Sequence, residues 1–213
     1  ANDAHQPEGV QRLSRETKRA PLPRVVSEAG LAAPGEAGFA GGVSPLDQLV
    51  ARLKLQPLPQ EGGWFAPVWR SELRLTGAAL PERYGAGAER AAASTILYLL
   101  AGNEFSALHR LRSDEVWQFH AGDAVELLRL GPAAGSGGWT RLGSAVAEGE
   151  APQAVVPHGV WQGARLAPGG KWALVGCTMV PGWDEADFEL GRREPLVAAW
   201  PEWADAIAAL TRG

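Results

Sequence analysis

The sequence has almost no cysteine: Cys177 is the only one in 213 residues. A single thiol cannot form an internal disulfide, which excludes a disulfide-stapled scaffold and favours a reducing compartment. No stretch approaches the roughly 18 consecutive apolar residues of a membrane-spanning helix, and the first residues lack the apolar core of a signal peptide. We therefore expect a cytoplasmic protein with no membrane partner.

An excess of positive charge is also missing, since 20 Lys and Arg face 24 Asp and Glu, for a net charge of -4. Nucleic-acid binding needs clustered basic side chains that neutralise phosphates, so a nucleic-acid partner is not expected. The phosphate-binding pattern Gly-x-x-x-x-Gly-Lys and the nucleophile pattern Gly-x-Ser-x-Gly are both absent. Neither a nucleotide-binding loop of that type nor a serine nucleophile such as Ser94 or Ser106 is indicated.

The composition divides the chain into an N-terminal extension, 1–42, and one domain, 43–213. The extension mixes Pro, Gly, Ala and alternating charges without periodicity, which predicts a flexible segment. Ser44 then precedes a proline and an apolar stripe at helical spacing, which predicts a short amphipathic helix. Trp203, Ile207 and Leu210 predict a second helix after Pro201.

Short apolar or alternating runs separated by Gly and Pro fill the region between the two helices. Such runs, without helical connectors, predict an antiparallel β-sandwich or barrel. The predicted strands are 94–100, 105–111, 115–120, 124–130, 138–142, 154–156, 160–166 and 172–180.

The most informative stretch runs from His109 to Gly122. Strand alternation places Glu115, Trp117 and Phe119 on one face, and Val116, Gln118 and His120 on the other. A carboxylate between two aromatic residues on a buried face is costly unless another group pairs with it or uses it. Glu115 is therefore either hydrogen-bonded for structural reasons or functional.

This stretch resembles the first motif of the cupin superfamily, His-x-His followed by Glu and Gly, in which His109, Glu115 and Gly122 match. The second cupin motif, Pro-x-Gly-x-x-His, resembles residues 157–162. The resemblance implies His109, Glu115 and Gln162 as candidate ligands of a divalent metal. However, Leu111 and Gln162 stand where the family motifs have histidine, and glutamine is a weak donor, so no cofactor is the preferred expectation.

Several ordered motifs make the chain similar to a narrower group, the uncharacterised cupin-5 family, which has an RmlC-like jelly roll named after a sugar-nucleotide epimerase. The motifs span roughly residues 46–200 and lie in 58–65, 70–71, 94–100, 106–122, 156–166, 174–178, 181–183 and 187–191. The resemblance implies a mainly β fold, a cupin double-stranded β-helix with a few peripheral helices. It also implies a small-molecule pocket and a homodimer, but it brings no settled reaction.

Other residues are candidates for ligand binding or catalysis. Glu61 precedes two glycines that permit close backbone approach, and it is predicted either to grip a polar ligand with Arg70 or to form a surface ion pair with it. The hydroxyl of Tyr98 needs a partner in an apolar run and is a candidate acid, with core packing as the alternative. Trp117, Phe119, Trp161 and Gln162 are predicted to line the pocket. Cys177 is expected to be inert packing, and the acidic run 184–189 a solvated face.

These residues leave three functional hypotheses. In the first, His109 is a general base, Glu115 orients or protonates, and Tyr98 supplies an acid in an isomerase, epimerase or dehydratase acting on a polar, sugar-like substrate. In the second, His109, Glu115 and Gln162 hold a metal in a dioxygenase or lyase. The third is a binding module without catalysis.

Overall fold

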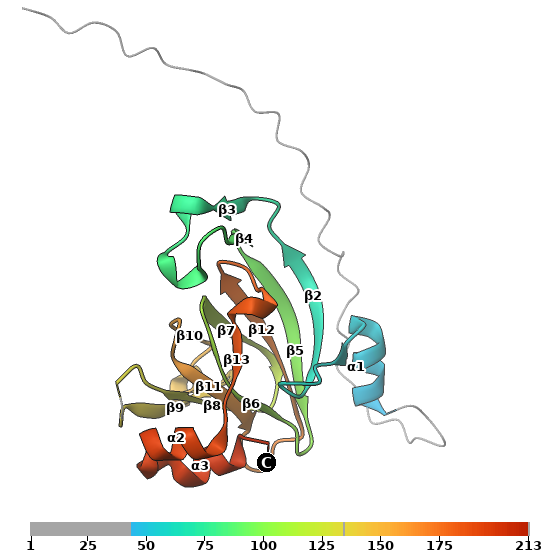
Figure 1. Cartoon of the computed structure of the whole chain (residues 1–213). Helices are drawn as coiled ribbons and strands as arrows, with labels where there is room; N and C mark the ends of the chain where they lie inside the picture. The colour runs from blue at the N-terminus through green and yellow to red at the C-terminus, as the bar shows by residue number, and fades with distance from the viewer. Residues whose placement is uncertain (1–43, 134, 213) are drawn as a thin grey trace, which may run out of the picture. The chain divides into compact units, whose positions relative to one another are not determined.

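Two antiparallel β-sheets face each other and form the body of the protein (Figure 1). The computed structural model describes residues 44–133 and 135–212, so the predicted extension 1–42 lies outside the described residues. The larger sheet has the strand order β1-β2-β5-β12-β7-β10, the smaller has β13-β6-β11-β8-β9, and β3 and β4 form a separate pair. This arrangement confirms the expected jelly-roll fold.

The strand bounds are β1 (Gln56–Pro57), β2 (Trp64–Arg70), β3 (Arg74–Thr76), β4 (Glu89–Ala91), β5 (Ser94–Ala101), β6 (Phe105–Leu111), β7 (Asp114–Gly122), β8 (Val125–Leu130), β9 (Gly137–Leu142), β10 (Gln153–Val156), β11 (Trp161–Leu166), β12 (Trp172–Val180) and β13 (Phe188–Leu190). The helices are α1 (Pro45–Leu53), α2 (Arg193–Ala199) and α3 (Ala204–Ala209), with short 3-10 turns η1 (Gly77–Ala79), η2 (Glu82–Tyr84), η3 (Val146–Glu148), η4 (Glu185–Asp187) and η5 (Pro201–Trp203). The eight predicted strands correspond to β5 to β12.

Strands β1 to β4, β13 and helix α2 were not singled out from the sequence. Most of these strands have three residues or fewer, which is too short for alternation to emerge. In β2, Pro67 interrupts the pattern, but its missing N–H is tolerated because β2 pairs there only with β5. The prediction of a solvated face for residues 184–189 is wrong at Asp187, which is buried and accepts hydrogen bonds from the guanidinium of Arg90 at 2.6 and 2.8 Å.

Both predicted helices are present, and their apolar stripes cover outer faces of the sheets. Ser44 caps α1 by accepting a hydrogen bond from the Asp47 backbone at 3.1 Å. The α1 stripe packs against Leu55, Ala66 and Leu99 of the larger-sheet side. Helices α2 and α3 cover the outside of the smaller sheet.

The core therefore has an interior and an exterior layer. The interior cluster between the sheets is built around Tyr98, Trp117, Leu127 and Val175. The exterior cluster joins Leu108, Leu128 and Trp161 of the smaller sheet to Ile207 and Leu210 of the C-terminal segment. No helix within residues 44–133 and 135–212 combines the length and apolar character that crossing a bilayer requires.

Docking of the C-terminal segment should depend on Ile207, which is fully buried. We expect Ile207→Ala to lower the free energy of unfolding by about 2–5 kcal/mol, because it removes buried methyl groups and leaves a cavity. Val146→Ala is the matched control, since Val146 is 56% exposed and should change stability by less than about 0.5 kcal/mol. Urea denaturation checks both values, and equal losses would contradict the docking described above.

Candidate functional site

Strand β7 presents Glu115, Trp117 and Phe119 to the interior, as the alternation predicted. Glu115 and Trp117 are 7% and 1% exposed, and Phe119 packs against the interior cluster. His120 lies on the other face and is exposed. The carboxyl group of Glu115 is therefore surrounded by the barrel core.

A β-bulge in β6 brings two further polar side chains to the same interior. His109 pairs with Gln162 and Ser106 with Ala164, with a register shift between the two pairs. Simple alternation would put Ser106 and His109 on opposite faces, because they are three residues apart. The extra residue in β6 corrects the alternation by one position, so Ser106 and His109 both point inward, like their partners Ala164 and Gln162. Gly163 permits the bulge, because a Cβ there would meet Leu108 and the Ser106 carbonyl at 3.1 Å.

The imidazole of His109 is fixed by the bulge. Its Nδ1 lies 2.8 Å from the carbonyl oxygen of Ala107, and the ring is buried and stacks on Phe188 with centroids 5.3 Å apart. A carbonyl oxygen only accepts, so Nδ1 carries the hydrogen and, in the neutral ring, Nε2 carries the lone pair. This tautomer suits a general base or a metal ligand.

Glu115 belongs to a chain of hydrogen bonds across the interior. The Gln162 amide nitrogen donates to Glu115 Oε2 at 2.6 Å, and the Trp117 indole donates to Gln162 Oε1 at 3.0 Å. Because an indole N–H only donates, it fixes which end of the Gln162 amide faces Glu115. The two neighbours thus hold the carboxyl group in one orientation.

Burial raises the pKa of Glu115 to about 7, and the negative charge of Glu61 adds to the increase. The charge of His109, the hydrogen bond from Gln162 and the nearby indole N–H of Trp117 lower it, but desolvation is the larger effect. Near neutral pH both protonation states of this carboxyl group are therefore populated.

Glu61 reaches the same cluster from the loop before β2. Ser106 donates to Glu61 Oε1 at 2.6 Å, and the Tyr98 hydroxyl donates to the carbonyl oxygen of Gly62 at 2.8 Å. Gly63 has φ +68°, and a Cβ there would meet Leu99 O at 2.7 Å, so this close approach requires glycine. Burial first, and then Glu61, raises the pKa of Tyr98 well above its usual value. Tyr98 therefore stays protonated and holds the loop, and its proton is engaged by Gly62 rather than free for a substrate.

The structure brings most of the predicted site residues together, with two exceptions. Trp161 belongs to the exterior cluster and lies under the guanidinium of Arg110 at 4.7 Å, because adjacent residues of β11 point to opposite faces and Gln162 points inward. Arg70 is exposed on β2 and forms no ion pair with Glu61 among the described residues. The residues that meet inside the barrel are Glu61, Tyr98, His109, Glu115, Trp117 and Gln162, with Phe119 beside them.

Sequence reasoning missed two neighbours of this cluster, Ser106 and Phe188, and expected a third, Cys177, as packing. Ser106 was set aside as a nucleophile, and its role as a donor to Glu61 depends on the bulge. Cys177 lies opposite Trp117 in the sheet, and burial, followed by the charge of Glu115, raises the pKa of its thiol well above the usual value. Phe188, which stacks on His109, lies in the acidic run 184–189 and was not predicted to contact the site.

The residues predicted as metal ligands do not fit a metal ion in this arrangement. Gln162 Oε1, the only ligating atom of the glutamine, accepts from Trp117, and the amide nitrogen donates to Glu115, so this side chain is already held by two hydrogen bonds. The described part of the chain has no group of three or more His, Cys, Asp or Glu placed to hold a metal. Transition metals favour three or more protein ligands, and His109 and Glu115 alone do not meet that need.

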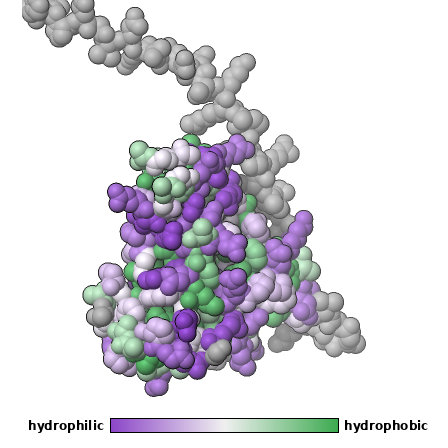
Figure 2. Space-filling model, in the orientation of Figure 1, coloured by the Kyte–Doolittle hydropathy of each residue, from purple (hydrophilic) through white to green (hydrophobic). Residues whose placement is uncertain are grey.

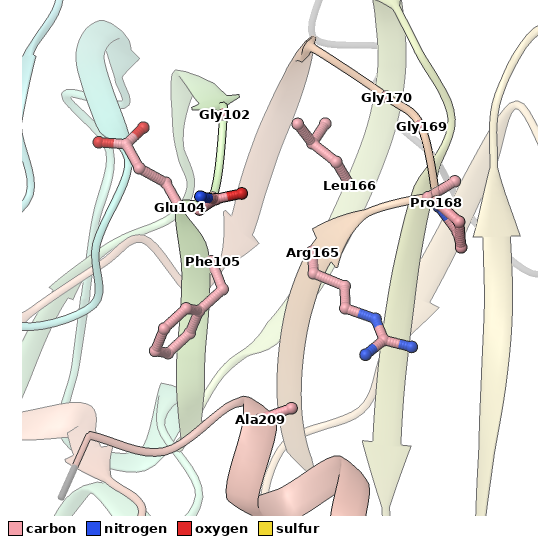
Figure 3. Close-up of a pocket in the computed structure, with 11 residues that line it drawn as sticks. Gly102, Glu104, Phe105, Arg165, Leu166, Pro168, Gly169, Gly170 and Ala209 are labelled. Atoms are coloured by element: carbon pink, nitrogen blue, oxygen red, sulfur yellow. The ribbon is translucent and has the colours of Figure 1, made fainter.

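Two surface cavities lie at opposite ends of the barrel. One, of about 290 Å³, is lined by the β5–β6 and β11–β12 turns; Figure 3 shows its Glu104 and Arg165 pointing to different sides, and Arg165 is paired with Glu126. The other, of about 450 Å³, includes Leu111 and Phe188 and therefore adjoins His109. The second cavity is the one of these two whose lining stacks on His109, through Phe188.

The raised pKa of Glu115 predicts a pH-dependent stability. Between its ordinary pKa of 4.5 and its folded value of about 7, the unfolded chain has lost the proton that the folded chain retains. The free energy of unfolding should therefore fall by about 3 kcal/mol as pH rises through this window. Glu115→Gln should remove this decline, as measured by urea denaturation across the window.

The control for this prediction is Glu148→Gln, which removes an exposed carboxyl group in η3. It should follow the wild-type pH profile. If the stability difference between the wild-type chain and Glu115→Gln stayed constant across the window, Glu115 would not carry the perturbed pKa.

Known proteins share this architecture. A protein from Shewanella oneidensis has 34% identity and a TM-score of 0.67, over 80% of this chain and 99% of its own. A hypothetical protein from Leishmania major has 29% identity and a TM-score of 0.69, over 78% and 98%. Among curated proteins, no relative matches. Residues 47–191 match the Cupin_5 model, described as cupin superfamily (DUF985), and the chain therefore belongs to that family.

Proposed function

We propose that this protein is a small-molecule-binding cupin that transfers a proton on a polar, sugar-like substrate by acid–base chemistry between His109 and Glu115. The observation that carries the proposal is the buried imidazole of His109, held by the Ala107 carbonyl with Nε2 as its basic atom, in the same interior as the Glu115 carboxyl group. The family supports ligand binding in the barrel.

The proposed step is an isomerisation, epimerisation or dehydration. His109 Nε2 takes a proton from a carbon next to a carbonyl group, and protonated Glu115 gives a proton to the oxygen on which negative charge develops. Glu115 then recovers its proton from the enol oxygen, while His109 returns its proton to the neighbouring carbon in an isomerisation or to a departing hydroxyl, which leaves as water, in a dehydration. In an epimerisation a water molecule delivers a proton to the other face and takes up the one held by His109. None of these steps needs an oxidant or reductant. A carboxyl group that titrates near neutral pH suits both donation and recovery of the proton.

The neighbouring residues position these two groups. Gln162 and Trp117 orient Glu115, while Tyr98 and Ser106 hold the loop that carries Glu61. We propose that Glu61 accepts a hydrogen bond from a substrate hydroxyl, and that Trp117 and Phe119 form the apolar wall of the site. A positioning role for Tyr98 replaces the acid role expected from the sequence.

Exchange of a substrate C–H proton with deuterated solvent tests the proposal. A panel of sugar nucleotides and related sugars is incubated with the protein in deuterated buffer, and incorporation is followed by NMR. We expect incorporation with at least one compound, and a fall of about 100-fold or more in His109→Gln and in Glu115→Gln.

His120→Gln is the matched control for this experiment. It makes the same chemical change on the exposed face of β7, so the exchange rate should stay at the wild-type value. Absence of exchange across the panel, combined with a ligand found by native mass spectrometry, would instead favour a binding module without catalysis.

We also propose a homodimer formed along β2. In the described chain, β1 pairs only with Trp64 and Phe65, which leaves the outer edge of β2 from Ala66 to Arg70 unpaired. Val68 and Trp69 on this edge are 59% and 53% exposed. An unpaired strand carrying exposed apolar side chains is a favourable site for a second strand.

Trp69→Lys should therefore shift the protein from dimer to monomer in light scattering after size-exclusion chromatography, because it adds charge to the proposed contact. Val146→Lys places the same side chain at an exposed position outside this edge and should remain dimeric. A wild-type monomer at high protein concentration would contradict the proposed dimer.

A further inference from the structure

The cavity of about 450 Å³ next to His109 is rich in arginine. It is formed where four segments meet: η2, the β6–β7 turn, the β10–β11 turn and the segment from η4 to β13. Its lining includes Arg83, Arg110 and Arg112 against two carboxylates, Asp187 and Glu189. Its size is that of a small-molecule site.

Both carboxylates that line the cavity are already bound to arginine. Asp187 accepts two hydrogen bonds from Arg90, and Glu189 accepts two from Arg110 at 2.8 and 3.0 Å. These pairs satisfy the negative groups through bidentate contacts. The charge of Arg110 is consequently balanced within the cavity wall.

Arg83 and Arg112 remain without a carboxylate partner. Neither forms an ion pair with any residue in the described ranges, and the guanidinium of Arg112 has no hydrogen bond there either. Arg83 donates from Nε to the Arg112 carbonyl oxygen at 2.9 Å, and its guanidinium lies over the Tyr84 ring at 5.0 Å. The terminal nitrogens of both side chains are therefore open to an oxyanion, for which the planar guanidinium is well suited.

One further acidic group lies close to this cavity and competes for its cations. Partial burial raises the pKa of Asp114, but hydrogen bonds from His158 and the charge of Arg83 outweigh this effect and keep the pKa below its usual value. Asp114 accepts from both the backbone and Nδ1 of His158, at 2.8 and 3.0 Å. The Asp114 carboxylate is thus hydrogen-bonded to His158, and the positive charges of Arg83 and Arg112 are not paired with a carboxylate among the described residues.

The floor of the cavity connects it to the interior site. Phe188 lines the cavity, and its ring also stacks on the His109 imidazole. Leu111, which pairs with Phe188 across the β6–β13 ladder, lines the same floor. One aromatic side chain therefore contacts both the cavity and the proposed base.

We propose that this cavity is an anion subsite in which Arg83 and Arg112 bind the phosphate group of a phosphorylated small molecule. Because Phe188 lines the cavity and also stacks on His109, one ligand would have its phosphate group in the cavity and its reacting carbon next to His109. This link rests on the function proposed above. The substrate class is thereby narrowed to phosphate-bearing polar compounds.

Inorganic pyrophosphate is the probe for this subsite, in a titration followed by two-dimensional NMR of the full chain. We expect saturable shifts concentrated at the backbone amides of Leu111, Gly159 and Phe188, which line the cavity. Arg83→Gln and Arg112→Gln should each weaken binding by about tenfold or more, because each removes charge-assisted hydrogen bonds. Arg52→Gln makes the same charge change on an exposed side chain of α1 and should bind like the wild-type chain.

Thermal unfolding of each variant is compared with the wild-type chain, and Arg112→Gln, whose exposed guanidinium has no partner in the described chain, should unfold at the same temperature. His109→Gln should still bind pyrophosphate, because the subsite does not include His109. Absence of saturable binding, or wild-type affinity in both cavity variants, would overturn the subsite. Proton exchange without a pyrophosphate site would overturn the subsite alone, whereas a pyrophosphate site without exchange would support it and refute the acid–base function.

Discussion

Burial of the Glu115 carboxyl group among apolar side chains is the constraint on which the interior of this cupin barrel depends. A carboxylate taken out of water is unstable unless neighbours compensate it, and here the compensation comes from Gln162, itself fixed by Trp117. The desolvation penalty that these hydrogen bonds do not offset raises the pKa of Glu115 to about 7. A group that is held in place and titrates near neutrality is suited to proton transfer, so the same burial explains both the local packing and the proposed chemistry.

The interior and the exterior of the barrel are lined by different kinds of side chain. Inside, β6, β7 and β11 supply the polar cluster around His109 and Glu115, while outside, the C-terminal segment covers the smaller sheet with an apolar layer. Hydrophilic side chains dominate much of the face seen in Figure 2, with apolar ones gathered in the middle. His109 and Glu115 are 2% and 7% exposed, so access to these polar groups is restricted. The arginine-lined cavity adjoins His109 through Phe188, which stacks on the imidazole.

Much of the fold was predictable from local pattern. Alternation and Gly or Pro boundaries predicted β5 to β12, and the Ser44 cap predicted α1, because these signals lie within a few neighbouring residues. The faces of Glu115 and Trp117 followed from the same period. The β3–β4 pair, β13 and α2 were not predicted, since such short elements owe their existence to the surfaces on which they pack.

The sequence by itself determined the jelly-roll class, the inward face of β7 and the identity of the residues in the two cupin-like motifs. Only the tertiary structure decided which of them meet. Trp161 points to the exterior because its neighbour Gln162 points inward, so it does not line the site. Ser106 joins the site because a bulge shifts β6 by one position. Arg83, Arg112 and Phe188 come from distant segments whose approach no local pattern encodes. Long-range strand pairing places side chains from different segments at one point, and that pairing is a property of the folded chain.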